Sequence, residues 1–412
     1  MKLNKEQLAY LEENLGKTIL PLSIFENEDW PGAQPIEVLL YYKLKEWTFE
    51  QYQESFLKAA DHFNLFSSRM ITIDDDQYAL HYCTDGVEFH HLPSIDKSFN
   101  EIDIEDIKKK IVRIKTLPGE PLLSLTAMEI KDGWLGGVSV SHAVGDGISL
   151  IYFLYVWGCI IEGKDPKTFP IPSTQRLFKG RPVNSDKIDK VFTPPLSELN
   201  DVIQNRVKSK MEKYTIREYF TDEFFNEHKK KAKLENEDYN LSSNQIVTCY
   251  LLKKYHDHVL PHTDRIRLLI PIDLREIHPD VDSLYIGNAV FDGFIEFTKD
   301  EINKMSVYEI AYRLKEAVIK ARSRDLITSI SQVSPYGITF KAEIFKSYRP
   351  YNVERDIVSS NMTHLNDLEA LGIGEERGKF VYIAIPNQTS FVMLKEKSGR
   401  IFAEISGRYP LK

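Results

Sequence analysis

The chain has 412 residues, more than one hydrophobic core usually organises, so we expect two domains. Hydrophobic residues make up 42% of it and charged residues 28%, a composition typical of a globular protein with ample material for a packed core. The net charge of −8 argues against nucleic-acid binding, because that function needs a clustered basic surface.

Three features bear on where the protein resides. The charged N-terminus, residues 1–7, continues into an amphipathic helical pattern and does not resemble a signal peptide. The most apolar window, residues 148–161, is shorter than the ~20 residues that span a bilayer, so we expect no membrane span. Cys83, Cys159 and Cys249 are widely spaced among apolar neighbours, which favours neither disulfides nor a metal cluster. These features predict a cytoplasmic protein.

The first part of the chain alternates between helical and strand patterns. Helices are predicted over residues 4–15, from Thr48 onward, and over 102–115 and 148–161. Strands are predicted over residues 36–44, 68–73, 77–82, 87–92, 121–130 and 134–141. The last two strands pair across Lys131-Asp132-Gly133, whose Asp-Gly step is typical of a hairpin. His90 and His91 are neighbours in a strand and face opposite ways, which argues against a shared metal ion.

Periodicity is lost between Lys164 and Leu199, where prolines recur, and this stretch is typical of an interdomain connection. Beyond it, helices are predicted from Thr221 and over residues 244–258 and 306–323. Strands are predicted over residues 214–220, 267–275, 285–291, 356–360, 380–385, 389–396 and 401–405. We therefore predict a first domain over residues 1–175, a linker over 176–205 and a second domain over 206–412.

The stretch from Leu135 to Gly147 is the strongest indication of chemistry. Valines at every second position before His142 predict a strand, and the glycines on either side of Asp146 predict a tight turn into a helix. A histidine at the end of a rigid strand can be aimed as a general base. A purely structural histidine is the alternative. Asp146 lies in a glycine turn and need not face His142; it can instead tie the turn to a distant cation.

Residues 142–147, His-Ala-Val-Gly-Asp-Gly, resemble the HXXXDG signature of the acyltransferase superfamily that includes chloramphenicol acetyltransferase, the BAHD acyltransferases and nonribosomal condensation domains. Asp273-Leu274-Arg275, followed by residues 285–290, resembles the BAHD segment "D-x-R... Y-F-G-N". The order and spacing of these motifs make the resemblance specific. Ser141 replaces the first histidine of condensation domains, which favours the BAHD-like branch.

A third segment is more divergent. Ser359-Ser360-Asn361, followed by residues 371–374, is similar to the BAHD "T-S-W... D-F-G-W-G" segment. Asn361 and Ile373 stand where the family has tryptophan, and Ala370 stands where it has aspartate. These departures indicate a divergent member of the family.

The resemblance implies a mixed α/β fold of two chloramphenicol-acetyltransferase-like domains with mixed sheets, and an active-site channel between them. It implies that His142 and Asp146 form the catalytic motif, with Asp146 in a salt bridge to Arg275. Ser360 and Asn361 are the candidates to stabilise an oxyanion. The remaining residues that the resemblance implies support the site are Gly147, Gly287, Asn288, Gly372 and Gly374.

The implied activity is transfer of an acyl group from acyl-CoA to a hydroxyl or amine of a small molecule. With His142 as general base the transfer is direct, through a tetrahedral intermediate and without an acyl-enzyme. We expect a monomer with no metal and no cofactor other than acyl-CoA as co-substrate. Two alternatives stay open: the donor is an acyl carrier protein, as in condensation-like enzymes, or the chain is a non-catalytic binding protein on the same fold.

Overall fold

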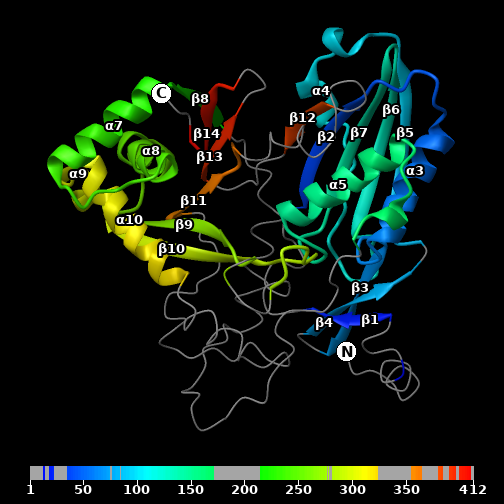
Figure 1. The fold of residues 1–412 in the computed structure, drawn as a ribbon, viewed down its shortest axis with the longest axis horizontal. Helices are drawn as coiled ribbons and strands as arrows, with labels where there is room; N and C mark the ends of the chain where they lie inside the picture. Colours follow the sequence, from blue (N-terminus) through cyan, green and yellow to red (C-terminus); the bar gives the residue numbers. More distant parts are fainter. Residues whose placement is uncertain are drawn as a thin grey trace.

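The computed structural model describes most of the chain in several stretches: residues 18–22, 35–74, 77–83, 85–170, 214–275, 281–322, 354–363, 379–383, 389–395 and 399–409, with Glu13 and Ile277. The helix predicted over 4–15, all but Glu13, lies outside these residues, as do the linker predicted over 176–205, Gly372 and Gly374. The described elements form two units, one on each side of Figure 1, and both mix helices with strands. The fold is therefore the mixed α/β class that the sequence predicts.

A five-stranded mixed sheet is the centre of the first unit, with strand order β12-β2-β7-β6-β5. Its strands are β2 (Ile36–Tyr42), β5 (Val87–Ile95), β6 (Leu123–Ile130), β7 (Gly133–Val140) and β12 (Lys379–Ile383). β6 and β7 are the predicted hairpin, while β5 runs parallel to β6. A three-stranded sheet of β1 (Ile19–Pro21), β4 (Gln77–Tyr82) and β3 (Ser68–Asp74) adjoins it through a bridge from Arg69 to Pro121.

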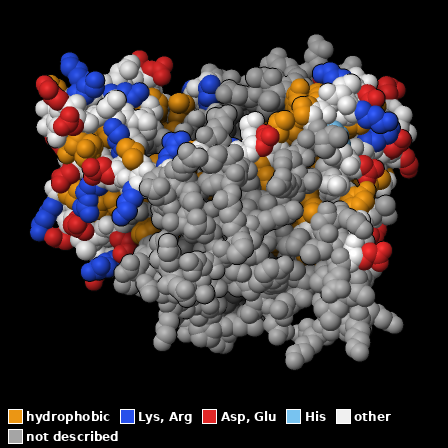
Figure 2. Space-filling view, turned by 60° about the horizontal axis from the view of Figure 1, so that its bottom comes forward, with side chains coloured by type: hydrophobic (Ala, Val, Ile, Leu, Met, Phe, Trp, Pro, Cys, Tyr) orange, Lys and Arg blue, Asp and Glu red, His pale blue; other side chains and the backbone are white. Residues whose placement is uncertain are grey.

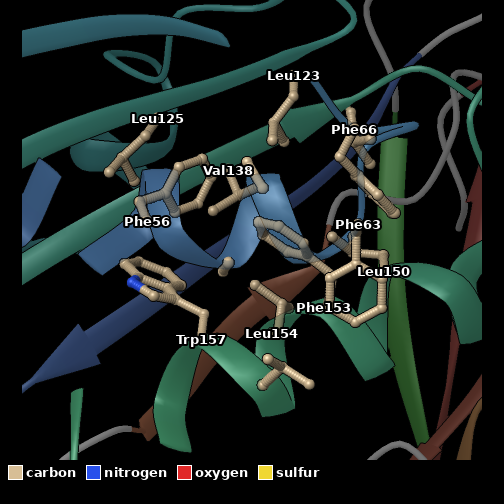
Figure 3. Close-up of a cluster of buried hydrophobic side chains, with 14 of the residues drawn as sticks. Phe56, Phe63, Phe66, Leu123, Leu125, Val138, Leu150, Phe153, Leu154 and Trp157 are labelled. Atoms are coloured by element: carbon tan, nitrogen blue, oxygen red, sulfur yellow. The ribbon is translucent and has the colours of Figure 1, made fainter. Parts of the chain in front are cut away.

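Helices α3 (Phe49–His62) and α5 (Gly147–Ile161) pack together against the five-stranded sheet and enclose the main core. Figure 3 shows this core, where the ring of Phe56 lies edge-on to both Phe153 and Trp157, with centroids 5.2 and 4.8 Å apart. α5 is the apolar run noted in the sequence, and its burial here accounts for that composition. Among the described helices none is long and apolar enough to cross a membrane.

The helix predicted over residues 102–115 is wrong in its length. The structure has a short 3-10 turn, Phe99–Glu101, and then α4 (Ile104–Lys108), after which the chain turns and has no regular structure over residues 112–117. Side chains of the sheet take over the backbone hydrogen bonds that a helix would satisfy internally. The Val112 N–H donates to Thr126 Oγ1 over 3.0 Å, and Ser124 donates to the Val112 carbonyl over 3.2 Å.

A six-stranded sheet with order β10-β9-β11-β13-β14-β8 organises the second unit. Its strands are β8 (Tyr214–Phe220), β9 (Arg265–Asp273), β10 (Val290–Thr298), β11 (Asp356–Asn361), β13 (Ser390–Lys395) and β14 (Ile401–Gly407). Figure 1 shows the helices gathered on one side of this sheet. They are α7 (Asp222–Glu235), α8 (Ser243–Val259), α9 (Lys299–Lys304) and α10 (Val307–Ala321).

Two strands of the second half of the chain differ from the sequence-based predictions, one in the sheet that it joins and one in where it begins. The strand predicted over 380–385 is present as β12, but it pairs antiparallel with β2 and so joins the sheet of the first unit. The domain boundaries stay a prediction, and the two halves interleave at this strand. The strand predicted over 285–291 begins only at Val290, because residues 285–289 form a loop whose backbone groups bind other side chains.

Candidate active site

His142 lies two residues after the end of β7, in a tight turn. The turn is closed by a 3.1 Å hydrogen bond from the Val144 N–H to the Ser141 carbonyl, and the Ser141 N–H donates to the Leu122 carbonyl over 2.9 Å. The His142 side chain is half-buried. Its Nδ1 is buried and has no hydrogen-bond partner among the described residues. The other ring nitrogen, Nε2, is therefore the one that can meet a substrate.

Asp146 ends the turn and caps α5, but its carboxylate is directed at other residues than His142. Oδ1 accepts hydrogen bonds from the Ser149 N–H at 2.9 Å and from Arg275 Nη2 at 3.1 Å. Oδ2 accepts from Arg275 Nη1 at 2.8 Å and from the Ala289 N–H at 3.0 Å. The hydrogen bonds of Asp146 in the described part of the chain do not include His142. The carboxylate thus ties the turn of the first unit to the loop of the second.

Arg275, just beyond β9, forms the other half of this ion pair, and both side chains are at least 96% buried, since 4% and 2% of their surfaces are exposed. Its guanidinium also donates to the Tyr285 carbonyl at 2.9 Å and to Asp273 at 2.9 Å. Burial by itself would lower the pKa of Arg275, but the carboxylates of Asp146 and Asp273 outweigh it and raise that pKa. The arginine is therefore a fixed cation, and the ion pair implied by the family resemblance is present.

Ser149 is a buried residue of the site that sequence analysis missed. Its Oγ lies 3.0 Å from Asp146 Oδ1 and 3.0 Å from the Gly287 carbonyl oxygen, either of which can accept its proton. The same oxygen accepts from the Gly287 N–H at 3.1 Å and from Arg275 Nη2 at 3.2 Å. Ser149 is thus a hub, a side chain that joins Asp146, Gly287 and Arg275. A Cβ on Gly145 would lie 2.6 Å from the Cβ of Ser149, so this arrangement requires glycine at position 145. The only local sequence feature that could have pointed to Ser149 is its place in the first turn of a helix that an aspartate caps.

Gly287 and Asn288 lie in the loop that faces this hub. Gly287 has φ of 153°, a backbone conformation that favours glycine, and its carbonyl also accepts the Asp146 N–H over 3.3 Å. Asn288 is buried. Gly147 is different: an added Cβ there would meet no atom within 4 Å, so open space lies beside the first residue of α5.

The oxyanion candidates lie at the end of β11 in the second unit. Ser359, their neighbour, is buried and shares a 2.7 Å hydrogen bond with Thr248 of α8. Ser360 alternates to the opposite face of the sheet and is half-buried, and its hydroxyl makes no hydrogen bond with a described residue. Asn361 is exposed, and its Oδ1 accepts from the N–H and hydroxyl of Thr363, which leaves its amide N–H groups to donate. Both residues can therefore supply a donor.

The described residues were compared with the features of a metal site and of a nucleic-acid-binding surface. No group of three His, Cys, Asp or Glu within those residues could hold a metal ion. His91 stacks on Phe49 at 4.2 Å, whereas His90 contacts Glu88 at 3.2 Å. Figure 2 shows positive and negative side chains interspersed over the described surface of the second unit rather than segregated into a basic stripe.

These observations join two segments more than a hundred residues apart into one site, the turn that holds His142 and the loop that follows Arg275. A family model described as the Transferase family matches residues 7–394. The chain belongs to the Transferase family. This is the family of the BAHD acyltransferases, so the resemblance found in the three motifs is confirmed and the protein is an acyltransferase.

Other relatives of this Transferase family member are distant. An uncharacterized acetyltransferase of Arabidopsis thaliana is 25% identical over 201 residues, which cover 46% of this chain and 43% of that protein, less than half of each. The solved structure of F. sporotrichioides TRI101 with coenzyme A and T-2 matches with a TM-score of 0.64 at 15% identity, over 94% of this chain and 95% of that one. Vinorine synthase matches with a TM-score of 0.61 at 13% identity, over 94% and 89%. The structural likenesses show a shared fold.

Proposed function

We propose that this protein transfers an acyl group from acyl-CoA to a hydroxyl or amine of a small molecule, with His142 as the general base. The observation that carries the proposal is the way His142 is held. It stands at the end of a buried strand, in a turn whose far end is locked by the Asp146–Arg275 ion pair. Its buried Nδ1 leaves Nε2 for the acceptor.

The transfer needs one proton carrier and one oxyanion donor. The imidazole of His142 takes the proton of the acceptor as the acceptor's oxygen or nitrogen attacks the thioester carbonyl. The resulting tetrahedral oxyanion receives a hydrogen bond from Ser360 or Asn361. Collapse breaks the carbon–sulfur bond, and His142 returns the proton to the departing thiolate. Asp146 acts in this proposal by holding the turn, since its carboxylate is already saturated by donors of both units.

The donor is proposed to be acyl-CoA rather than an acyl carrier protein. The solved TRI101 structures that share this fold contain coenzyme A, which supports that choice. The proposal includes no metal and no resident cofactor. We also propose that the protein is a monomer. A cytoplasmic location is proposed as well, in keeping with three cysteines that are free thiols in the structure.

Thermal unfolding of the purified protein with a panel of short, long and aromatic acyl-CoAs, beside free CoA and an acylated carrier protein, tests the proposal without knowledge of the acceptor. A ligand at 100 times its dissociation constant stabilises a protein by about 2.7 kcal/mol, enough for a clear shift in the unfolding temperature. A shift with one class of acyl-CoA supports the proposal and narrows the acyl group. A shift with the carrier protein alone would instead assign the donor to carrier proteins.

A further inference from the structure

No described side chain forms a hydrogen bond with Nδ1 of His142. In many sites with a histidine base, a carboxylate accepts the proton on the second ring nitrogen and so aims the ring. Here Nδ1 has no partner among the described residues, and Asp146 is committed to Ser149, Arg275 and Ala289. The backbone turn that carries the ring is therefore one determinant of its direction.

Ser141, the residue before His142, makes three hydrogen bonds that hold this backbone. It has no exposed surface. Its hydrogen bonds join it to the neighbouring strand before His142 and to the two residues that follow His142. Its N–H is anchored to Leu122 and its carbonyl accepts the Val144 N–H, which close the turn from outside. Its side chain adds a third bond, because Oγ accepts the Ala143 N–H over 3.1 Å. That bond spans the peptide unit on the far side of His142.

We propose that Ser141 is a positioning residue, whose hydroxyl fixes the turn that aims His142. This inference rests on the proposed function, in which His142 is the base. Ser141 is fully buried and touches no substrate, so it acts only through the histidine. Misplacing a catalytic group by about 1 Å can cost on the order of 100-fold in rate, and the loss falls on kcat because substrate contacts are unchanged.

Ser141→Ala removes only the side-chain acceptor and leaves both backbone hydrogen bonds in place. We expect kcat to fall about 10- to 100-fold with KM unchanged. Ser141→Cys keeps the volume but supplies a weak acceptor and should also lose kcat, whereas Ser141→Thr keeps the oxygen and should retain it. Ser139→Ala is the matched control: Ser139, near the end of β7, is as buried as Ser141, and its Oγ accepts the Ile114 N–H rather than one in the turn.

A second measurement does not depend on turnover. The His142 ring signal in an NMR spectrum of the eleven histidines can be assigned by its loss in His142→Ala. We expect Ser141→Ala to shift this signal, while Ser139→Ala leaves it in place.

The outcomes separate the two levels of the proposal. If His142→Ala abolishes transfer but Ser141→Ala keeps the wild-type kcat and the wild-type ring signal, the positioning role is wrong and the base assignment stands. If His142→Ala transfers at the wild-type rate, the proposed function itself is wrong. A Ser141→Ala protein that loses stability and kcat together, and that Ser141→Thr fails to restore, would show a merely structural serine.

Discussion

Asp146 and Arg275, 129 positions apart in the sequence, form a buried ion pair with two contacts, 2.8 Å from Nη1 to Oδ2 and 3.1 Å from Nη2 to Oδ1. The pair connects the helix cap beside His142 to the loop after β9, so it is both a packing contact and the frame of the candidate site. Its loss should therefore be felt in stability and activity together.

We expect Arg275→Ala to lower the free energy of unfolding by about 3–5 kcal/mol, because it leaves the buried Asp146 carboxylate without its cation. Asp146→Asn should lower it by less, because Arg275 keeps Asp273 as a partner at 2.9 Å. Urea denaturation monitored by circular dichroism measures this, with acyl transfer assayed on the same preparations. Asp300→Asn is the control, since its pairing with Lys304 is 71% and 75% exposed and should contribute at most about 1 kcal/mol. A variant of the buried pair that stays fully stable yet inactive would point to direct participation in catalysis.

The two glycines that flank Asp146 should respond in opposite ways to alanine. At Gly145 the new Cβ would lie 2.6 Å from that of Ser149, and the resulting overpacking should cost about 1–3 kcal/mol. At Gly147 nothing lies within 4 Å, and replacing glycine in the first turn of α5 should leave stability equal or raise it by up to about 1 kcal/mol. Thermal unfolding of both variants compares them directly. Equal destabilisation by the two changes would refute this reading of the turn.

If the Ser360 hydroxyl or the Asn361 amide stabilises the oxyanion, removal of that donor should lower kcat. Removing a single donor of this kind typically lowers kcat about 100-fold or more. We expect that loss in Ser360→Ala or in Asn361→Ala, with the unfolding temperature unchanged because neither side chain is fully buried. Ser359→Ala, which breaks the 2.7 Å bond to Thr248, should by contrast lower stability. Full kcat in the Ser360→Ala, Asn361→Ala double variant would exclude both donors.

Glu37 gives a prediction about pH. It lies in β2 opposite Ser139 and is buried, and this burial raises the pKa of its carboxyl in spite of an ion pair with Arg113 at 2.6 Å. Above the unfolded value of about 4.5, the folded protein therefore retains a proton that the unfolded chain has lost. The stability that Glu37 contributes therefore falls as the pH rises from about 4.5 to the raised pKa of Glu37 in the folded protein.

Glu37→Gln should flatten this dependence, because the amide does not titrate. Urea denaturation at steps of pH from about 4 to 7 measures the slope, whose sign follows from the proton balance. Glu129→Gln, which changes an exposed carboxylate on β6 of the same sheet, serves as the control. The same slope in the Glu37→Gln protein as in the wild type would show that Glu37 does not cause it.

Local patterns predicted much of the fold because they depend on neighbours in sequence. The alternating valines before His142 give β7, and the Asp-Gly step gives the hairpin to β6. Thr48, Thr221 and Ser242 cap the helices that follow them, each through a hydrogen bond from its own first turn. Strand alternation, the Asp-Gly turn and the helix caps each depend on a few neighbouring residues, and in these segments the tertiary structure agrees with the local preference.

The parts that sequence analysis missed depend on distant partners. α4 ends early because the side chains of Thr126 and Ser124 bind the backbone of Val112, which follows it. β12 pairs with a strand more than three hundred residues earlier. Ser149 is a hub only because Gly287 lies against it, 138 positions away. The motif spacing could suggest the Asp146–Arg275 pair through family resemblance, but not the serine that completes it.

The most direct test of the central claim is the rate of acyl transfer in His142→Ala, measured as release of free CoA thiol from the acyl-CoA that stabilises the protein, with a panel of small alcohols and amines as acceptors. Loss of a general base should lower kcat by about 100- to 10,000-fold. The unfolding temperature should stay near that of the wild type, because the ring makes no hydrogen bond through its buried Nδ1 in the described structure. Transfer at the wild-type rate in this variant would contradict the assignment of His142 as the base.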